Sequence, residues 1–289
     1  MTISSQVTED IRDDFYDKRR IKSPFRYPGG KFYALKHILP FINAAKHDEY
    51  REPFVGGGAI FFAKPRVAHN WLNDIDEDLM TTYRVIADPG LRARLVTNLN
   101  NEIATKQRHQ EVKQIAPRTK SEIAFRTYYL NRTSFSGILN KPAWGYAVGQ
   151  SAPPKNWASM IIPAGKKLRD VKLTASDFED VLNAPAAGDR VLLYLDPPYF
   201  SSDQKRAYSW SFTTKEHIRV EKTLRDTDFM FCLSYDDSPE IRKMYSWANI
   251  YERSWLYNTA NCRGIQRKMG NELIITNYRV GKTNQDVLF

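Results

Sequence analysis

A tetrapeptide, Asp196-Pro-Pro-Tyr199, carries the most specific chemical pattern in the chain, because it directly follows an apolar run at residues 191–195. Pro197 and Pro198 cannot continue a central strand, so the backbone must leave the sheet at this point. A carboxylate, a proline carbonyl and an aromatic ring then lie together at the carboxyl end of the strand. This combination suits a planar ring with an amino group: Asp196 and the Pro197 carbonyl accept hydrogen bonds from the amino group, and Tyr199 stacks on the ring.

Three consecutive glycines mark a second candidate site, in the segment Phe54-Val-Gly-Gly-Gly58 between a predicted strand and a predicted helix. Gly56 and Gly58 let the backbone turn sharply and approach a ligand closely. Asp74 follows at the end of the next predicted strand, where an acid can bond ribose hydroxyls. The G-x-G-x-x-G spacing of nicotinamide sites is not met. A structural turn with a solvated acid explains these residues equally well when they are taken alone.

A third segment, Tyr27-Pro-Gly-Gly-Lys31, places a lysine beside two glycines. It does not form a phosphate-binding loop, because Phe32 follows the lysine and Phe25 stands where that loop needs a glycine. Lys31 could still reach an anion such as a carboxylate. Taken alone, the segment is more typical of a structural turn.

The elements that must position these residues alternate between strands and helices. Apolar runs predict strands at residues 191–195, 229–233 and 272–276. A short mixed stretch at 50–55, followed by three glycines, and residues 67–75, which end in acids, also indicate strands. Helical patterns cover residues 32–42, stopping near Pro40, then 59–63, 215–225 and a segment that begins with Asp237 as its N-cap. This alternation predicts an α/β fold with a parallel sheet, in which ligands bind at the carboxyl ends of the strands.

The middle of the chain departs from this alternation. Residues 77–136 have a helical pattern rich in Arg, Lys, Asn and Gln, and residues 137–163 are rich in Gly, Pro, Trp, Asn and Ser. The second stretch is typical of an irregular segment or a hairpin. We therefore expect an insertion between two parts of the α/β unit.

The composition bounds the function class. The chain has 289 residues, with 43 Lys and Arg against 33 Asp and Glu, a net charge of +10 that favours a polyanionic partner such as nucleic acid. Two cysteines are too few for a disulfide framework or a Cys-based zinc site, and no metal site is predicted. No apolar run approaches about 18 residues, and residues 1–20 lack the apolar core of a secretory signal. We therefore expect a cytoplasmic protein that does not enter a membrane.

The order of the motifs resembles that of the Dam-like family of DNA adenine-N6 methyltransferases. Residues 27–31, 54–58 and Asn73-Asp74 stand where that family has its cofactor motifs, and Asp196-Pro-Pro-Tyr199 matches its DPPY motif. Asn131-Arg-Thr-Ser-Phe-Ser-Gly137 and Asn271-Glu-Leu-Ile-Ile-Thr-Asn-Tyr278 are similar to two further family segments. The resemblance covers about residues 22–280. It implies a Rossmann-like methyltransferase domain with a mostly parallel central sheet, built from residues 1–83 and 169–289, and a helical and hairpin target-recognition insertion at 84–168.

By this resemblance the methyl donor is S-adenosylmethionine, and no metal is required. Tyr27 and Lys31 would lie beside its methionine part, with Lys31 close to the carboxylate. Asp74 would bind the ribose, above the turn formed by Phe54, Gly56 and Gly58. Asp177 would accept from the amino group of the donor's adenine and Phe178 would cover its face, although an Asp-Phe pair is also common at a helix start. The residues implied in catalysis are Asp196, Pro197, Pro198 and Tyr199, with Asp196 also bordering the donor.

The implied substrate is double-stranded DNA, from which the target adenine must be flipped out. Basic residues of the insertion and of a loop at 261–268 are expected to contact phosphates. Asn140 stands where relatives that read GATC have a basic residue, so another target is expected. Trp144 and Tyr146 either stack in the duplex or pack a small hairpin. The candidates for DNA contact are Arg118, Lys120, Arg126, Arg132, Asn140, Lys141, Trp144, Tyr146, Arg263, Arg267 and Lys268.

Three other functions stay open at this point. An RNA adenine methyltransferase would use the same motifs, and a comparison of DNA with RNA as substrate separates the two. A protein-glutamine methyltransferase is less favoured, because that group usually has Asn in place of Asp196. A catalytically silent DNA-binding regulator would have lost the donor motifs or the DPPY motif, and both are intact.

Overall fold

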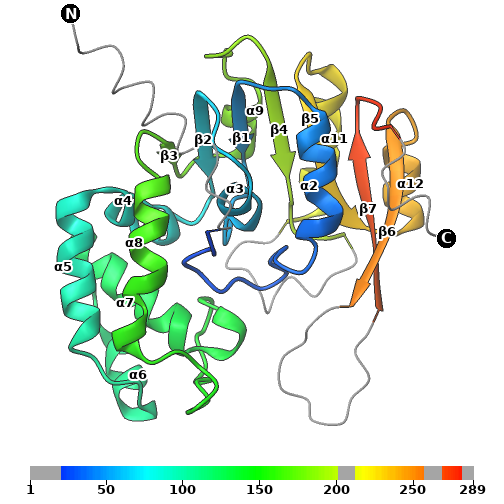
Figure 1. Cartoon of the computed structure of the whole chain (residues 1–289). Helices are drawn as coiled ribbons and strands as arrows, with labels where there is room; N and C mark the ends of the chain where they lie inside the picture. The colour runs from blue at the N-terminus through cyan, green and yellow to red at the C-terminus, as the bar shows by residue number, and fades with distance from the viewer. Residues whose placement is uncertain (1–20, 201–211, 257–268, 282–289) are drawn as a thin grey trace, which may run out of the picture.

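The computed structural model describes residues 21–200, 212–256 and 269–281. Its sheet has seven strands in the order β3-β2-β1-β4-β5-β7-β6, and β7 runs antiparallel to both of its neighbours (Figure 1). The strands are β1 (Glu49–Glu52), β2 (His69–Asn73), β3 (Lys172–Thr174), β4 (Val191–Leu195), β5 (Met230–Asp236), β6 (Asn249–Leu256) and β7 (Met269–Thr276). The predicted α/β class is confirmed. The expected mostly parallel sheet is also confirmed, and the exception is the edge that carries β6 and β7, where β7 pairs antiparallel with both neighbours.

Strand β4 shows why the sheet is covered on both faces. All of its residues are buried, and they alternate between two apolar cores. Leu192 and Tyr194 join the core that includes Ile38 and Phe61, while Leu193 and Leu195 face the other core. The first face is covered by α2 (Leu35–Ala44) and α3 (Ala59–Ala63), and the second by α9 (Phe178–Leu182), α11 (Thr214–Asp226) and α12 (Pro239–Met244). A continuous apolar run is what a strand buried on both faces requires.

The middle of the chain forms a group of helices beside the sheet, on the side where β4 ends (Figure 1). Side-chain oxygens of Asp76, Asp88, Thr105 and Thr119 each accept a hydrogen bond from an amide of the first turn, which explains where four of these helices begin. The helical pattern over 77–136 is thereby confirmed, divided into four. The group comprises α4 (Glu77–Ala87), α5 (Pro89–Asn100), α6 (Lys106–Gln114), α7 (Lys120–Thr133) and α8 (Ala158–Lys167).

Helix α8 begins inside the stretch that was expected to be irregular. Pro163 lies within the helix, and the apolar residues around it explain why the helix persists. Ile161 and Ala164 are buried, and Trp157 at the N-cap is buried against Tyr128 and Tyr129 with ring centroids 5.9 and 5.8 Å away. Tertiary packing therefore outweighs the lost hydrogen bond of the proline.

Two predicted helix ends are also wrong. Helix α2 continues through Pro40 to Ala44, because Phe41 and Ile42 are buried beyond the proline. Helix α12 is capped by Ser238, whose hydroxyl accepts from the Ile241 amide, and not by Asp237. The Asp237 carboxylate is held instead by the Arg242 guanidinium at 2.6 Å. No described helix is both long and apolar enough to cross a membrane.

Arg51 in β1 fastens the segment between α9 and β4 to the sheet. Its side chain is fully buried and forms an ion pair with Glu49 at 2.7 Å. Glu49 in turn accepts from the amides of Ala187 and Gly188 at 2.6 and 2.9 Å. The remaining guanidinium N–H groups donate to the carbonyl oxygens of Val181, Ala184 and Pro185, at 2.7 to 2.8 Å.

We expect Arg51→Leu to lower the free energy of unfolding by about 3–5 kcal/mol, because it leaves Glu49 buried without its cation and three carbonyls without donors. Chemical denaturation measures this change. The double variant Arg51→Leu with Glu49→Leu should recover part of the loss, since it removes the stranded charge. An unchanged denaturation midpoint in Arg51→Leu contradicts this account.

Candidate active site

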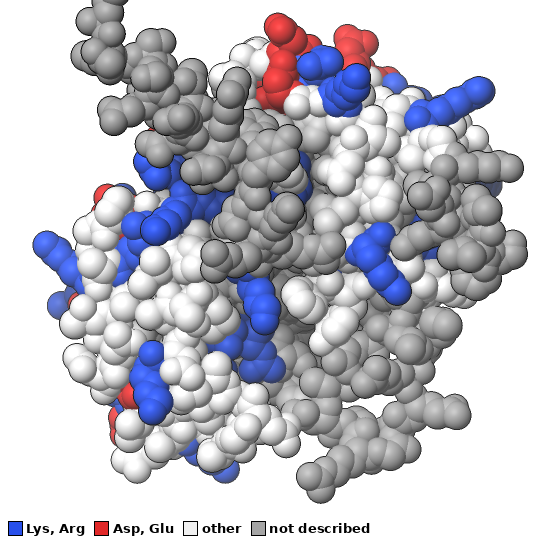
Figure 2. Space-filling view, viewed as in Figure 1, with Lys and Arg blue, Asp and Glu red and all other residues white. Residues whose placement is uncertain are grey.

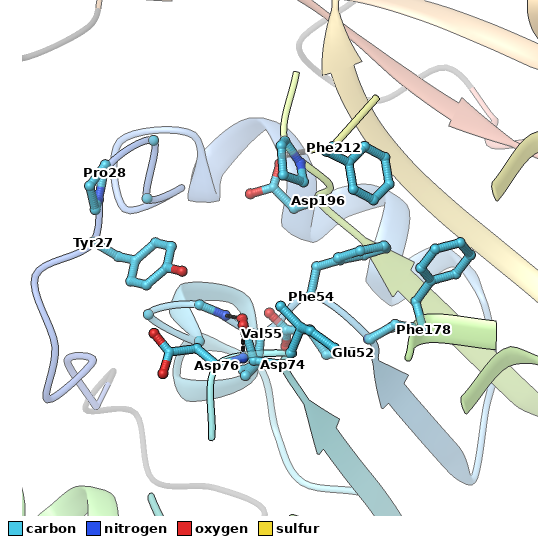
Figure 3. A pocket seen from close by; sticks show the side chains of 18 of the residues that line it. Tyr27, Pro28, Glu52, Phe54, Val55, Asp74, Asp76, Phe178, Asp196 and Phe212 are labelled. Atoms are coloured by element: carbon cyan, nitrogen blue, oxygen red, sulfur yellow. Dashed lines mark hydrogen bonds between the residues drawn. The ribbon is translucent and has the colours of Figure 1, made fainter. Parts of the chain in front are cut away.

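A cavity of about 300 Å³ opens at the carboxyl ends of β1, β2 and β4 (Figure 3). The structure brings together in its lining all of the residues expected around the donor: Tyr27, Lys31, Phe54, Gly56, Gly58, Asp74, Asp177, Phe178 and Asp196. Pro198 of the tetrapeptide also lines the cavity, whereas Pro197 and Tyr199 are not part of the lining. The three sequence motifs therefore form one site.

The glycine turn is shaped by backbone angles that only glycine adopts easily. Gly56 has a φ of +45° and Gly58 a φ of +66°. A Cβ atom at Gly56 would lie 2.8 Å from the ring of Tyr27, so the turn and that ring fit only without a side chain. Gly58 is the N-cap of α3. The turn thus exposes backbone to the cavity directly in front of a helix.

Asp74 holds this turn against the end of β2. Its Oδ2 accepts from the Gly56 amide at 2.9 Å, and its Oδ1 accepts from the Asp76 amide at 3.1 Å. Burial raises the pKa of Asp74 to about 6, although both hydrogen bonds favour the ionised form. A carboxylate has about four acceptor positions, so Asp74 can still accept from a ligand hydroxyl.

Two cavity residues beside the glycine turn were not predicted. Ile75 lines the cavity and is 48% exposed, which leaves apolar surface next to Asp74. Glu52, at the end of β1, is buried and accepts from the Tyr50 hydroxyl at 2.8 Å. Burial raises the pKa of Glu52 to about 8, so this carboxyl is mostly protonated at neutral pH. The signal for Glu52 in the sequence was its position at the end of a strand and before the glycines.

Asp196 is fixed by two side chains from distant segments. The Lys31 ammonium lies 2.7 and 2.8 Å from its two oxygens, and the Ser234 hydroxyl donates to Oδ1 at 2.9 Å. Lys31 was expected close to the carboxylate of the donor; in the structure it pairs with Asp196 and also donates to the Gly29 carbonyl at 3.1 Å. Burial lowers the Lys31 pKa, but the negative charges of Asp196 and Glu272 outweigh it and raise that pKa above its usual value.

Ser234 and Arg219 are further residues that the sequence did not single out. Ser234 lies in β5, next to β4, so its signal was a small polar residue near the carboxyl end of a neighbouring strand. Arg219 in α11 bonds Asp177 at 2.9 Å and lies 4.8 Å over the ring of Phe178. Asp177 also caps α9 by accepting from the Glu179 amide. The ring of Phe54 lies 5.3 Å from that of Phe178, so an aromatic wall forms beside this carboxylate.

The residues expected to contact DNA are spread over α7 and the segment that follows it. Asn140 lines the cavity, and Lys141 is exposed with a φ of +51°. Trp144 packs on Tyr146 and His109, with ring centroids 5.7 and 5.6 Å away, and therefore builds the local hairpin. Arg118 lies just before α7, Lys120 is its first residue, and Arg126 and Arg132 lie within it. Arg263, Arg267 and Lys268 lie outside the described residues.

Two arginines form an uncompensated cationic pair next to the cavity. Burial, followed by the positive charge of Arg132, lowers the pKa of Arg26, and burial lowers the pKa of Arg132. The Nε of Arg132 is buried without a hydrogen-bond partner. Neither guanidinium forms an ion pair in the part of the chain that the structure describes. Arg26 was not among the predicted contacts.

No group of three His, Cys, Asp or Glu residues within 21–200, 212–256 and 269–281 is arranged to hold a metal ion. The cavity instead combines a glycine turn, buried carboxylates, aromatic rings and the tetrapeptide.

The sequence was also compared with those of known proteins. The sequence model of the D12 class N6 adenine-specific DNA methyltransferases matches residues 27–259. The chain belongs to this family. It is therefore an adenine-specific, site-specific DNA methyltransferase. Methyltransferases of this kind use S-adenosylmethionine in general.

Curated relatives of the methyltransferase align over most of its length. A type II methyltransferase of Lactococcus lactis subsp. cremoris is 27% identical over 88% of this chain and 95% of its own. A type II methyltransferase of Methanocaldococcus jannaschii is 28% identical over 89% of this chain and 99% of its own. A DNA N-6-adenine-methyltransferase of Escherichia phage P1 is 24% identical over 88% of this chain but only 35% of its own.

We expect the affinity of the methyltransferase for S-adenosylmethionine to fall by up to about tenfold between pH 7 and pH 5. Asp74, whose pKa is about 6, is ionised at pH 7 and mostly protonated at pH 5, and protonation removes an acceptor from the cavity. Calorimetric titrations between pH 5 and 7 measure the effect. Asp74→Asn should bind more weakly at pH 7 and show a flat profile; a wild-type dissociation constant that does not change over this range contradicts the assignment.

Proposed function

We propose that this enzyme binds S-adenosylmethionine in the cavity at the carboxyl ends of β1, β2 and β4, and methylates N6 of an adenine flipped out of double-stranded DNA. One observation carries the proposal: the carboxylate of Asp196, held by Lys31 and Ser234, borders the same cavity as the glycine turn. A methyl acceptor bound at Asp196 and a donor bound at the turn would therefore meet within one cavity.

The cavity residues fit the donor in chemistry. Bound S-adenosylmethionine would supply an electrophilic methyl group. Asp74 would accept from a ribose hydroxyl, because the backbone amides of Gly56, Ile75 and Asp76 leave one of its about four acceptor positions open. Ile75 and Phe178 offer apolar surface for the adenine, and Asp177 offers an acceptor for its amino group. A Cβ atom at Gly56 would clash with the ring of Tyr27, so this glycine lets the ring pack against the turn where the methionine part would lie.

Asp196 and the Pro197 carbonyl would act on the target amine. The N6 lone pair of adenine is delocalised into the ring, so the amine is a poor nucleophile. Two acceptors for its hydrogens favour a tetrahedral nitrogen whose lone pair points at the methyl group. Because Lys31 and Ser234 hold the carboxylate at 2.7 to 2.9 Å, its orientation is set before the base arrives. Pro198 would border the base, and Tyr199 would stack on it. Positioning then supplies most of the rate enhancement.

The basic residues support a duplex as the substrate. An adenine inside a duplex cannot reach the cavity, so it must leave the base stack at a cost of about a few kcal/mol. Figure 2 shows Lys and Arg side chains in the middle of the face between the helical group and the sheet. Arg26 and Arg132 supply two cations without acidic partners among the described residues, and phosphate oxygens would provide them. Arg126, Lys141 and the residues Arg263, Arg267 and Lys268 would add contacts.

Catalysis and target recognition are assigned to different parts of the chain. We assign residues 1–83 and 169–289 to the catalytic domain and residues 84–168 to target recognition. Asn140 lines the cavity from this second region, and an Asn side chain pairs bidentately with adenine better than with guanine. A target other than GATC follows from this choice. Because the substrate is DNA, the cytoplasm is the proposed location.

The experiment that tests the proposal has two parts. Methylation-sensitive sequencing of a host that expresses the protein would identify the methylated site. Transfer of a radiolabelled methyl group to duplex DNA, single-stranded DNA and RNA of the same sequence would then define the substrate. Preferred methylation of RNA or of single strands contradicts the proposal.

We expect Asp196→Ala to reduce methyl transfer by at least about 100-fold, because it removes the acceptor that orients N6. Donor affinity should change by less than about tenfold, since the glycine turn and Asp74 stay in place. A radiolabelled-methyl assay and calorimetry measure the two quantities. Asp228→Ala, an exposed site at the amino side of β5, serves as the matched control. Undiminished turnover in Asp196→Ala would remove the basis of the assignment.

We expect Arg26→Gln and Arg132→Gln each to weaken binding of cognate and unrelated duplexes to a similar degree. Each variant should reduce the slope of log affinity against log salt by about 0.9, because one phosphate contact is lost. Fluorescence anisotropy at several salt concentrations measures this slope. Arg190→Gln, exposed beside the amino end of β4, should leave it unchanged. A slope equal to that of the wild type in both cavity-side variants means that the pair binds no phosphate.

A further inference from the structure

Glu272 is a buried carboxylate at the active site that none of the roles above uses. It lies in β7, on the antiparallel edge of the sheet, and is only 1% exposed. The hydroxyl of Tyr199, from the tetrapeptide, donates a hydrogen bond to its Oε2. A buried carboxylate is costly unless charged or polar partners surround it. Its partners therefore indicate what it contributes.

The second partner of Glu272 is the lysine that holds Asp196. The negative charge of Glu272 contributes to the raised pKa of Lys31, so the two charges are close. The Lys31 ammonium also lies 4.7 Å from the centroid of the Tyr199 ring. Glu272 thus attracts the Lys31 ammonium, which also pairs with Asp196. It also accepts a hydrogen bond from Tyr199, whose ring lies next to that ammonium. Asp196 and Tyr199 are joined through Lys31 and Glu272.

Other charged groups near Glu272 come from the neighbouring strands. The β5–β7 and β6–β7 registers place Asp236 and Arg253 directly opposite Glu272. Asp236 accepts from the amide of Phe200, the residue after the tetrapeptide. The backbone on the far side of Tyr199 is therefore tied to β5, while its hydroxyl is tied to β7. The two ties hold the ring from both ends.

We infer that Glu272 is a positioning residue for the target base, acting through the Tyr199 hydroxyl. A tyrosine that stacks on a flipped adenine must hold its ring in one orientation, because a small misplacement of the base carries N6 away from Asp196. A phenol can rotate about its side-chain bonds unless its far end is anchored. Glu272 provides this anchor from β7, none of whose described residues lines the cavity. The inference rests on the proposed base site beside Asp196.

Four variants test the role of this hydrogen bond. Glu272→Ala and Tyr199→Phe each remove it, and we expect either to lower kcat by about 10- to 100-fold. Their combination should be no worse than one of them alone, because the same interaction is lost. Glu272→Gln keeps a side-chain acceptor of the same size, so it should retain most of the wild-type kcat. Donor dissociation constants, measured by calorimetry, should stay within about twofold in all four.

A second readout follows the base itself. The duplex carries 2-aminopurine in place of the adenine that the wild-type enzyme methylates. We expect the fluorescence of the bound duplex to change in the same direction in Glu272→Ala and Tyr199→Phe, and to stay at the wild-type value in Glu272→Gln. A purely structural role would instead lower donor affinity and the unfolding temperature of Glu272→Ala together with its activity.

Three results would overturn the inference. They are wild-type kcat in Glu272→Ala, additive losses in the double variant, and a Glu272→Gln variant as impaired as Glu272→Ala while Tyr199→Phe stays active. The last result would mean that the charge matters and the hydrogen bond does not. Failure of the underlying base site is distinguishable, because wild-type enzyme would then give no fluorescence change on binding the 2-aminopurine duplex.

Discussion

The ion pair between Lys31 and Asp196 is the interaction on which the rest of the site depends. It joins a turn before α2 to the point where β4 leaves the sheet, at an N–O distance of 2.7 Å. Lys31 is 6% exposed, so its charge has lost most of its water and requires its partners. With the lysine anchored on Asp196, the glycines before it are held over the cavity. Lys31 and Ser234 hold the Asp196 carboxylate, which fixes the orientation of the first residue of the tetrapeptide.

On the neighbouring strands, too, buried charged side chains bond the backbone of other segments. β2 ends in Asp74, which accepts from two amides and thereby fixes the glycine turn. β1 carries Glu49 and Arg51, which together bond five backbone groups of the segment before β4. In each case a buried charge bonds backbone of another segment, which a neutral apolar side chain could not do. The cavity is preorganised because its borders are hydrogen-bonded to charges that cannot move into water.

The sequence predicted the parts of the site that are local in the chain. The tetrapeptide, the glycine turn and Asp74 each lie at or just after the end of a predicted strand. Because the carboxyl ends of parallel strands meet at one edge, their convergence in one cavity could be anticipated. Ser234, Glu272 and Arg219 were not singled out, because a single polar residue in a strand or on a helix is only a weak signal in the sequence. β3 escaped prediction because Lys172–Thr174 is short and has one apolar residue. Helix α8 escaped because its proline and glycine suggested a loop, whereas burial of Ile161 and Ala164 decides its conformation.

Hydrogen bonds between α7 and the segment before Tyr27 connect the helical group to the border of the cavity. Asn131 at the end of α7 accepts from the Arg26 amide at 2.9 Å and donates to the Arg26 and Gly137 carbonyls at 2.6 and 3.0 Å. Gly137, with a φ of +74°, lies so close that a Cβ atom would be 2.4 Å from the Arg26 carbonyl oxygen. The next residue after Arg26 is Tyr27, which borders the cavity. Movement of α7 would therefore shift the border of the cavity, because Asn131 links this helix by hydrogen bonds to the segment that carries Tyr27.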